Sequence, residues 1–232
     1  MMRALSRGED QNDPRVEAAP HTTMASSENP TYTYPSDWRD FSDDGLNPML
    51  RAARDLLAQH GYHATSIRSI AKLAGLSVPG LYHHYESKQA ILDALVSRGI
   101  AQMLAHTRAA DHESDGTAIG RFNNVIDCLL RFHMFRRDEA FIASSEMRSM
   151  EPDVLRRHVA ARDVQQGMIT EIIKQGIAEG TFHCPYPKET SRAVSSLCVS
   201  VSSWYRPGGP MSIDTIAARY LDIARRAVGF RD

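Results

Sequence analysis

The sequence has few of the residues that would support a disulfide-stapled or membrane-spanning fold. Only three of its 232 residues are cysteine, at Cys128, Cys184 and Cys198, and none forms a C-x-x-C pair. Such cysteines are typical of reduced side chains in an intracellular protein. No apolar run approaches the ~20 residues of a membrane span, and the first residues lack the apolar stretch of a secretory signal. We therefore predict a cytoplasmic protein with no membrane partner.

The sequence also lacks the local patterns that carry catalysis. It contains no nucleophile elbow, phosphate-binding loop, dinucleotide-binding glycine pattern, zincin motif or paired carboxylates. The adjacent residues His83 and His84 would diverge by ~100° on a helix, and no matching ligand set accompanies them. The sequence thus predicts no enzyme, no catalytic residue, no cofactor and no metal site.

Charge is nearly balanced over the chain but unevenly distributed. The formal net charge is −1 at pH 7. Residues 1–47 hold 4 Lys and Arg against 9 Asp and Glu, whereas residues 48–108 hold 7 against 3 and also five of the histidines. A basic segment suits phosphate binding, although a charge of this size is also compatible with a solvated face.

Residues 1–44 combine low hydrophobicity with four prolines and excess acid. Such a composition cannot bury enough apolar surface to order itself, so we predict a disordered acidic tail. Aromatic residues near its end, such as Trp38 and Phe41, either dock on the folded body or belong to a linker, and the linker is the simpler interpretation.

From Asn47 onward, apolar residues recur at helical spacing, and no segment alternates with the period of a strand. Asn47, Ser77 and Ser87 are placed to cap helices, as is Thr65 or Ser66. These signals predict an all-α fold. The expected helices cover about 48–59, 67–74, 78–84, 87–107, 118–136, 138–150, 153–179, 188–205 and 212–228.

The spacing of Ala71, Gly75 and Leu81 matches a helix-turn-helix. A small residue allows the two helices to cross, a glycine forms the turn, and an apolar residue lies on the inner face of the second helix. The second helix of such a motif enters the major groove of DNA. This spacing alone also arises by chance, so it needs support from neighbouring residues.

That support comes from the run between Gly61 and Lys88, GYHATSIRSIAKLAGLSVPGLYHHYESK. It resembles the DNA-binding region of TetR-family repressors, over about residues 46–96. The shared elements are a Gly-Tyr pair, a Thr before the second helix, an Ile-Ala pair, a Gly-Leu-Ser turn and a Leu-Tyr-x-His-Tyr-x-Ser-Lys close. The resemblance implies a three-helix DNA-binding domain at 45–95 and a helical-bundle ligand-binding and dimerisation domain at 96–232.

The same resemblance implies that Thr65 touches a backbone phosphate and that Tyr82 and Lys88 clamp phosphates on either side of the groove. Such contacts set the register rather than the sequence that is read. Arg68 has the guanidinium geometry that recognises guanine, but a solvated arginine is an equal alternative. The full set of candidate DNA-binding residues is Thr65, Ser66, Arg68, Ser77, Val78, Pro79, Gly80, Tyr82, His83 and Lys88.

The C-terminal region carries signals for dimerisation and for a ligand. A single recognition helix reads few base pairs, so we expect a homodimer on a palindromic operator. The last two helices are the expected interface, although their apolar stripes could instead face the subunit's own core. The Glu146–Met150 segment with Arg162, and the stretch 203–210, resemble TetR-family regulators of acyl-CoA, fatty-acid or sterol catabolism. The candidate ligand-binding residues are Phe132, Phe135, Met147, Arg148, Arg162, Trp204 and Arg206.

We therefore expect a DNA-binding transcriptional regulator, a repressor released from its operator by a small apolar or acyl-CoA-type inducer. Two alternatives remain. One is an architectural DNA binder without a ligand. The other is a regulator that responds to a cationic, drug-like ligand. Such a ligand would require buried acids that face the pocket, and the candidates are Asp127, Glu139 and Glu146.

Overall fold

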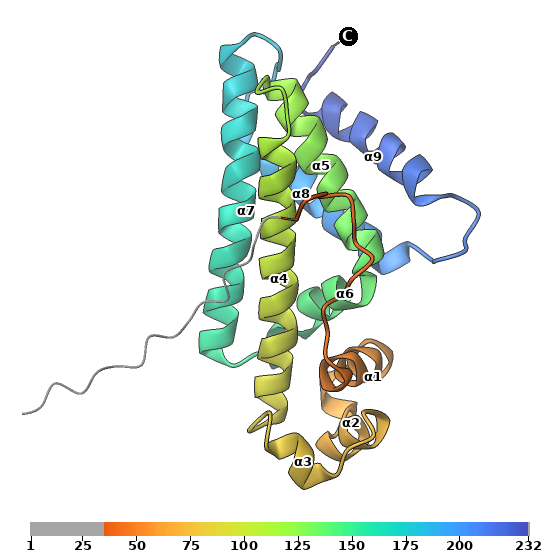
Figure 1. Cartoon of the computed structure of the whole chain (residues 1–232). Helices are drawn as coiled ribbons and strands as arrows, with labels where there is room; N and C mark the ends of the chain where they lie inside the picture. Colours follow the sequence, from red (N-terminus) through yellow and green to blue (C-terminus); the bar gives the residue numbers. More distant parts are fainter. Residues whose placement is uncertain (1–34, 232) are drawn as a thin grey trace, which may run out of the picture. The chain divides into compact units, whose positions relative to one another are not determined.

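The computed structural model describes residues 35–231, which are helical with no strand in that range (Figure 1). The predicted all-α fold is confirmed. In chain order the elements are α1 (Pro48–Ala64), α2 (Ile67–Leu73), α3 (Val78–Tyr82), α4 (Lys88–His112), α5 (Ala118–Phe135), α6 (Arg137–Ser145), the 3-10 helix η1 (Glu146–Ser149), α7 (Pro152–Ala178), α8 (Pro187–Trp204) and α9 (Ile213–Ala227).

The predicted helix starts are explained by side-chain caps. The Asn47 side chain accepts a hydrogen bond from the Leu50 amide, and Pro48 occupies the first turn of α1. Ser66, rather than Thr65, caps α2 in a reciprocal arrangement with Ser69. The end of α1 differs from the prediction, because the helix passes through a kink at Gly61, whose φ is +75°, before ending at Ala64.

The first apolar core joins α1, α2 and α3 to the start of α4. Fully buried contacts come from Ala53, Ile70, Leu81 and Leu92. Ile142 of α6 belongs to the same core. The short helices are thus held by α4 and α6 together, because helices of this length have little stability of their own.

The second core is built around α5, which packs against α4, α7, α8 and α9 (Figure 1). Phe122, Ile126 and Leu129 of α5 meet Ile169 and other apolar residues of α7 there. All three cysteines are buried and free. Among residues 35–231, no helix combines the length and the apolar character needed to cross a membrane.

Residues 35–46 form a segment that docks on the helical body, so the predicted disorder of residues 1–44 is wrong for residues 35–44. We call this segment the N-terminal strap. Trp38 and Phe41 are 2% and 4% exposed. The Trp38 carbonyl lies 2.9 Å from His106 Nδ1, and the Phe41 ring stacks on His106 at 4.5 Å and on Phe135 at 5.3 Å.

The prediction failed here because two large aromatic side chains bury enough apolar area to order a short polar segment. At its end the strap also contacts α1, where Asp44 pairs with Arg51 at 2.8 Å and with Arg54 at 3.0 Å. The rest of the predicted tail, residues 1–34, lies outside the described residues.

Candidate DNA-binding surface and ligand pocket

The turn between α2 and α3 has the geometry that a helix-turn-helix requires. Gly75 has a φ of +72°, and the Leu76 amide donates to the Ala71 carbonyl at 2.9 Å. This is a Schellman ending, which favours glycine because a left-handed backbone strains other residues. Ala71 and Leu81 are buried between the helices, as the spacing predicts.

One side of α2 and α3 presents polar side chains to solvent. Ser66, Arg68, Ser77, Pro79, Tyr82 and His83 are exposed, and Val78 and Gly80 are half-buried. Tyr82 is 49% exposed, so its hydroxyl is free to reach outward. A Cβ on Gly80 would lie 3.2 Å from the capping hydroxyl of Ser77. The glycine therefore also protects the cap of α3.

The Thr65 side chain is buried inside the domain, whereas the prediction placed it at a DNA phosphate. Its side chain is 3% exposed, and its hydroxyl hydrogen-bonds to the carbonyls of Leu56 at 3.2 Å and Gly61 at 2.8 Å. A buried hydroxyl with carbonyl partners is a structural tie across the kink of α1. The prediction is corrected on this point.

Lys88 likewise has internal partners. Its ammonium donates to the carbonyls of Tyr62 and Thr65, each at 2.8 Å, and lies 4.0 Å from the centre of the Tyr62 ring. Two of the three ammonium donors are thereby used. The sequence pattern could not reveal this, because the two carbonyls meet Lys88 only through the kink and the end of α1, where the Tyr62 carbonyl also accepts from the Thr65 amide at 3.3 Å.

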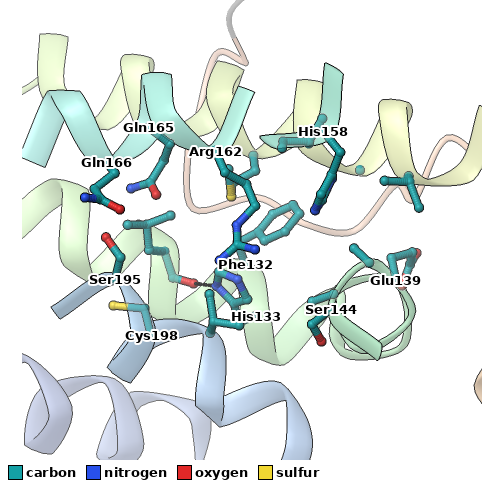
Figure 2. A pocket seen from close by; sticks show the side chains of 18 of the residues that line it. Phe132, His133, Glu139, Ser144, His158, Arg162, Gln165, Gln166, Ser195 and Cys198 are labelled. Carbon is teal, nitrogen blue, oxygen red and sulfur yellow. Dashed lines mark hydrogen bonds between the residues drawn. The ribbon is translucent and has the colours of Figure 1, made fainter. Parts of the chain in front are cut away.

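A cavity of about 210 Å³ lies among α4, α5, α6, α7 and α8 (Figure 2). Its wall is mostly apolar, with Leu95, Ile100, Met103, Leu129 and Phe132 among the lining residues. Largely apolar clefts with a few polar groups are typical of small-molecule sites. The structure therefore has a candidate ligand pocket in the region where the sequence predicts one.

The predicted ligand residues divide into two groups. Phe132 and Arg162 line the cavity, and Met147 contacts it indirectly, with its sulfur 3.7 Å from Arg162 Nη1. The other four lie outside the lining. Phe135 is 45% exposed and stacks on the strap, Arg148 and Arg206 are exposed, and Trp204 packs 5.6 Å from the Tyr220 ring.

Sequence reasoning missed several polar lining residues. His158, Gln165 and Gln166 line the cavity from α7 together with Arg162. Their spacing of three and four residues places them on one helical face. That periodicity was a usable signal, but it was hidden among the many other polar residues of α7. His133 of α5 and Ser195 of α8 carried no such signal.

Burial sets the charge state of the pocket's imidazoles. Burial lowers the pKa of His133 to about 4, and its Nδ1 lies 2.7 Å from the Leu129 carbonyl. Burial also lowers the pKa of His158 to about 4, with the Arg162 charge as a second cause. Both rings are therefore neutral near pH 7.

The pocket wall continues into the DNA-binding helices through α6. Glu139 lines the cavity, and its Oε1 lies 3.7 Å from Nη1 of Arg54 on α1. Just beyond α6, Glu146 accepts a hydrogen bond from the Tyr62 amide at 3.2 Å. The Gln89 side chain of α4 donates to the Ser149 carbonyl. A movement of α6 would therefore change its contacts with α1 and displace the residues after α6 that contact α1 and α4.

The expected dimer stripes face mainly inward. Val194, Cys198 and Val201 of α8 and Ile216 and Ala224 of α9 are all buried in the subunit's own core. An apolar surface does exist beside them, where Trp204, Met211 and Ile223 are 37%, 36% and 48% exposed. These residues border a shallow groove together with Ile216, Arg219 and Tyr220. Tyr220 and Ile223 belong to the apolar stripe that the sequence predicts for α9, so an interface on the last two helices stays a prediction.

A helix-turn-helix with an exposed polar face, joined to a helical domain with an apolar cavity, defines a DNA-binding regulator. Residues 49–95 match the family model described as bacterial regulatory proteins, tetR family. Residues 115–228 match the tetracyclin repressor-like C-terminal domain. The chain belongs to the TetR family of transcriptional regulators.

Individual relatives agree with this assignment. The HTH-type transcriptional repressor KstR2 of Mycobacterium tuberculosis is 27% identical over 177 residues, which are 75% of this chain and 88% of KstR2. A tetR-family regulatory protein from Rhodococcus RHA1 is 30% identical, with a TM-score of 0.76 over 82% of this chain and 100% of that one. The fold also resembles AibR in complex with isovaleryl coenzyme A and operator DNA, at 19% identity and a TM-score of 0.69, over 75% of this chain and 95% of AibR.

Proposed function

We propose that this regulator is a repressor that binds a palindromic operator as a homodimer and releases it when a small molecule fills the cavity among α4 to α8. The inducer is either a small apolar molecule or an acyl-CoA. The observation that carries the proposal is the position of Glu139, which lines the cavity and pairs with Arg54 of α1. Similarity to a named repressor and to a regulator crystallised with isovaleryl coenzyme A and operator DNA supports it.

On the DNA side, we propose that the exposed residues of α2 and α3 meet the duplex. Arg68 and His83 are free to reach base edges, and Tyr82 is free to reach a phosphate. Ser66, Ser77, Val78, Pro79 and Gly80 complete the surface. Lys88 contributes by holding the end of α1 in place, with one remaining donor for a phosphate.

On the ligand side, binding must favour one arrangement of the two DNA-binding domains over the other. A ligand with equal affinity for both arrangements would release nothing. The contact of α6 with α1 provides the route, since a ligand that shifts Glu139 also shifts the helix that carries the helix-turn-helix.

The first test is a selection from random duplexes at low salt with the full chain. We expect enrichment of a palindromic sequence. Arg68→Ala and His83→Ala should each weaken binding to that sequence by ~1–3 kcal/mol if they read a base. Arg192→Ala, which changes an exposed arginine of α8, is the matched control and should bind normally. Absence of any preferred sequence would contradict the proposal.

A further inference from the structure

The cavity contains three buried polar atoms that have no hydrogen-bond partner among residues 35–231. They are His158 Nδ1, Gln165 Nε2 and Ser195 Oγ. His158 and Gln165 are each only 6% exposed, and all three residues line the cavity. Buried polar groups are normally hydrogen-bonded, so these three are suited to partners supplied by a ligand.

The three groups lie at different places along the cavity. In Figure 2, Gln165 of α7 and Ser195 of α8 lie at the same end, whereas His158 lies further along α7, beyond Arg162. The sequence spacing agrees, because His158 precedes Arg162 by four residues and Gln165 follows it by three. One end of the cavity therefore presents the Gln165 amide and the Ser195 hydroxyl. The other part presents the His158 imidazole and the Arg162 guanidinium, one helical turn apart on α7.

Arg162 is the only lysine or arginine among the described residues that line the cavity. Figure 2 shows its side chain reaching from α7 toward Phe132 and His133. Its one hydrogen bond within residues 35–231 is to the Met147 sulfur. By contrast, the nearby Arg156 and Arg157 are paired with Asp153 and Asp93, each at 2.6 Å. Arg162 thus offers one positive charge to a ligand.

Two carboxylates limit how much negative charge the cavity accepts. Glu139 and Asp163 also line it. Burial raises the pKa of Glu139, while the charges of Arg54 and Arg136 act in the opposite direction. Both histidines are neutral near pH 7, so they add no further positive charge. The cavity lining therefore offers one cation, which matches the charge of a single carboxylate and leaves the further charges of a polyanion such as coenzyme A without a partner there.

We propose that the ligand is a compact amphipathic carboxylic acid that carries a second, uncharged oxygen. Its carboxylate pairs with Arg162 and accepts a hydrogen bond from neutral His158. Its apolar body lies against Leu129, Phe132 and their neighbours, and its far hydroxyl or keto oxygen meets Gln165 and Ser195. This inference rests on the proposed function of the cavity as the inducer site, and it replaces the two inducer classes named there with an amphipathic free acid.

The test uses calorimetric titration of the full chain with four probes of equal chain length: 10-hydroxydecanoate, decanoate, 1-decanol and decanoyl-CoA. We expect the hydroxy acid to bind most tightly, decanoate less tightly, and decanol least. Arg162→Met should weaken binding of both acids at least tenfold and leave decanol unchanged. Arg157→Met, on the same helix, is the matched control and should bind all probes normally.

The far oxygen has its own test. Ser195→Ala and Gln165→Leu should each weaken the binding of 10-hydroxydecanoate about fivefold and leave the binding of decanoate unchanged. Either variant is sufficient for the test if the other fails to fold. The proposal is overturned if neither acid binds, if decanol binds as well as the acids, if Arg162→Met leaves acid binding unchanged, or if decanoyl-CoA binds more tightly than both acids.

Operator release is measured separately by fluorescence anisotropy with a labelled duplex. Acid binding that leaves the operator complex intact would contradict the proposed induction while keeping the ligand class. Release by decanoyl-CoA alone would keep the induction and overturn the ligand class. The two proposals therefore fail through different results.

Discussion

The Lys88 ammonium ends at two backbone carbonyls of the segment that follows the kink in α1. Lys88→Met keeps the apolar stem and removes every donor, leaving both carbonyls without this partner. We expect the free energy of unfolding to fall by ~1–3 kcal/mol, the usual cost of losing hydrogen bonds to a charged group. Urea denaturation measures it.

Lys72→Met is the control, because Lys72 is exposed on the neighbouring helix α2 and should change stability by less than ~0.5 kcal/mol. Equal stability of the Lys88 variant and the native chain would show that the ammonium does not hold these carbonyls in solution. The salt dependence of DNA binding would then reveal any role at a phosphate.

His133 makes stability depend on pH. Its pKa is lowered to about 4 by burial, below the usual value of ~6.5 in an unfolded chain. The unfolded state therefore takes up a proton more readily, and stability falls as the pH drops from ~6.5 toward 4, with a loss of ~2 kcal/mol by pH 5 from this residue. His133→Gln, which cannot take up this proton, should reduce the difference between urea midpoints at pH 7 and pH 5. An undiminished difference would assign the effect to other groups.

At the scale of elements, α6 connects the cavity to α1. Glu139→Gln and Arg54→Gln should each change the free energy of operator binding. The change in the double variant should differ from the sum of the two single changes by ~0.5–3 kcal/mol, as for residues in contact. Fluorescence anisotropy with the selected duplex measures the cycle. Arg51→Gln, whose carboxylate partner is Asp44 rather than Glu139, replaces Arg54→Gln in the control cycle. Additive effects in the first cycle would mean that the ion pair carries no coupling.

Elements are also the scale at which sequence reasoning succeeded. Caps such as Asn47, Ser77 and Ser87 act through neighbouring residues, so helix starts follow from local sequence. The burial of Ala71 and Leu81 follows from the same short-range spacing. Strap docking was not predictable in this way, because Trp38 and Phe41 are buried by residues distant in the chain.

The candidate site was predicted less completely for the same reason. Arg68, Pro79 and Tyr82 are exposed on one continuous motif, so the local sequence was enough to group them on one surface. The cavity takes its lining from five helices, so only their packing brings Ser195 near Gln165. The internal partners of Thr65 and Lys88 could not be predicted because they are backbone carbonyls, which every residue has and no sequence pattern marks.

At the scale of the whole molecule, the exposed apolar surface of α8 and α9 is the proposed dimer interface. Ile223, 48% exposed on α9, lies beside Trp204 at a shallow groove. We expect Ile223→Glu to give monomers in sedimentation velocity and to weaken operator binding by ~10²–10⁴-fold, because two linked half-site contacts become independent. Val164→Glu, at an apolar residue of α7 that is 50% exposed, is the control. A dimeric Ile223→Glu chain would place the interface elsewhere.

The strap has a practical consequence for anyone who shortens this chain. A fragment beginning at Met49, where the match to the family's DNA-binding model starts, would lose Trp38, Phe41 and Asp44. It would uncover Phe132, whose ring lies 6.2 Å from Phe41 and which also lines the cavity. In such a fragment, water would reach the outer side of the cavity wall at Phe132. Ligand affinities measured on the fragment would therefore not apply to the intact regulator.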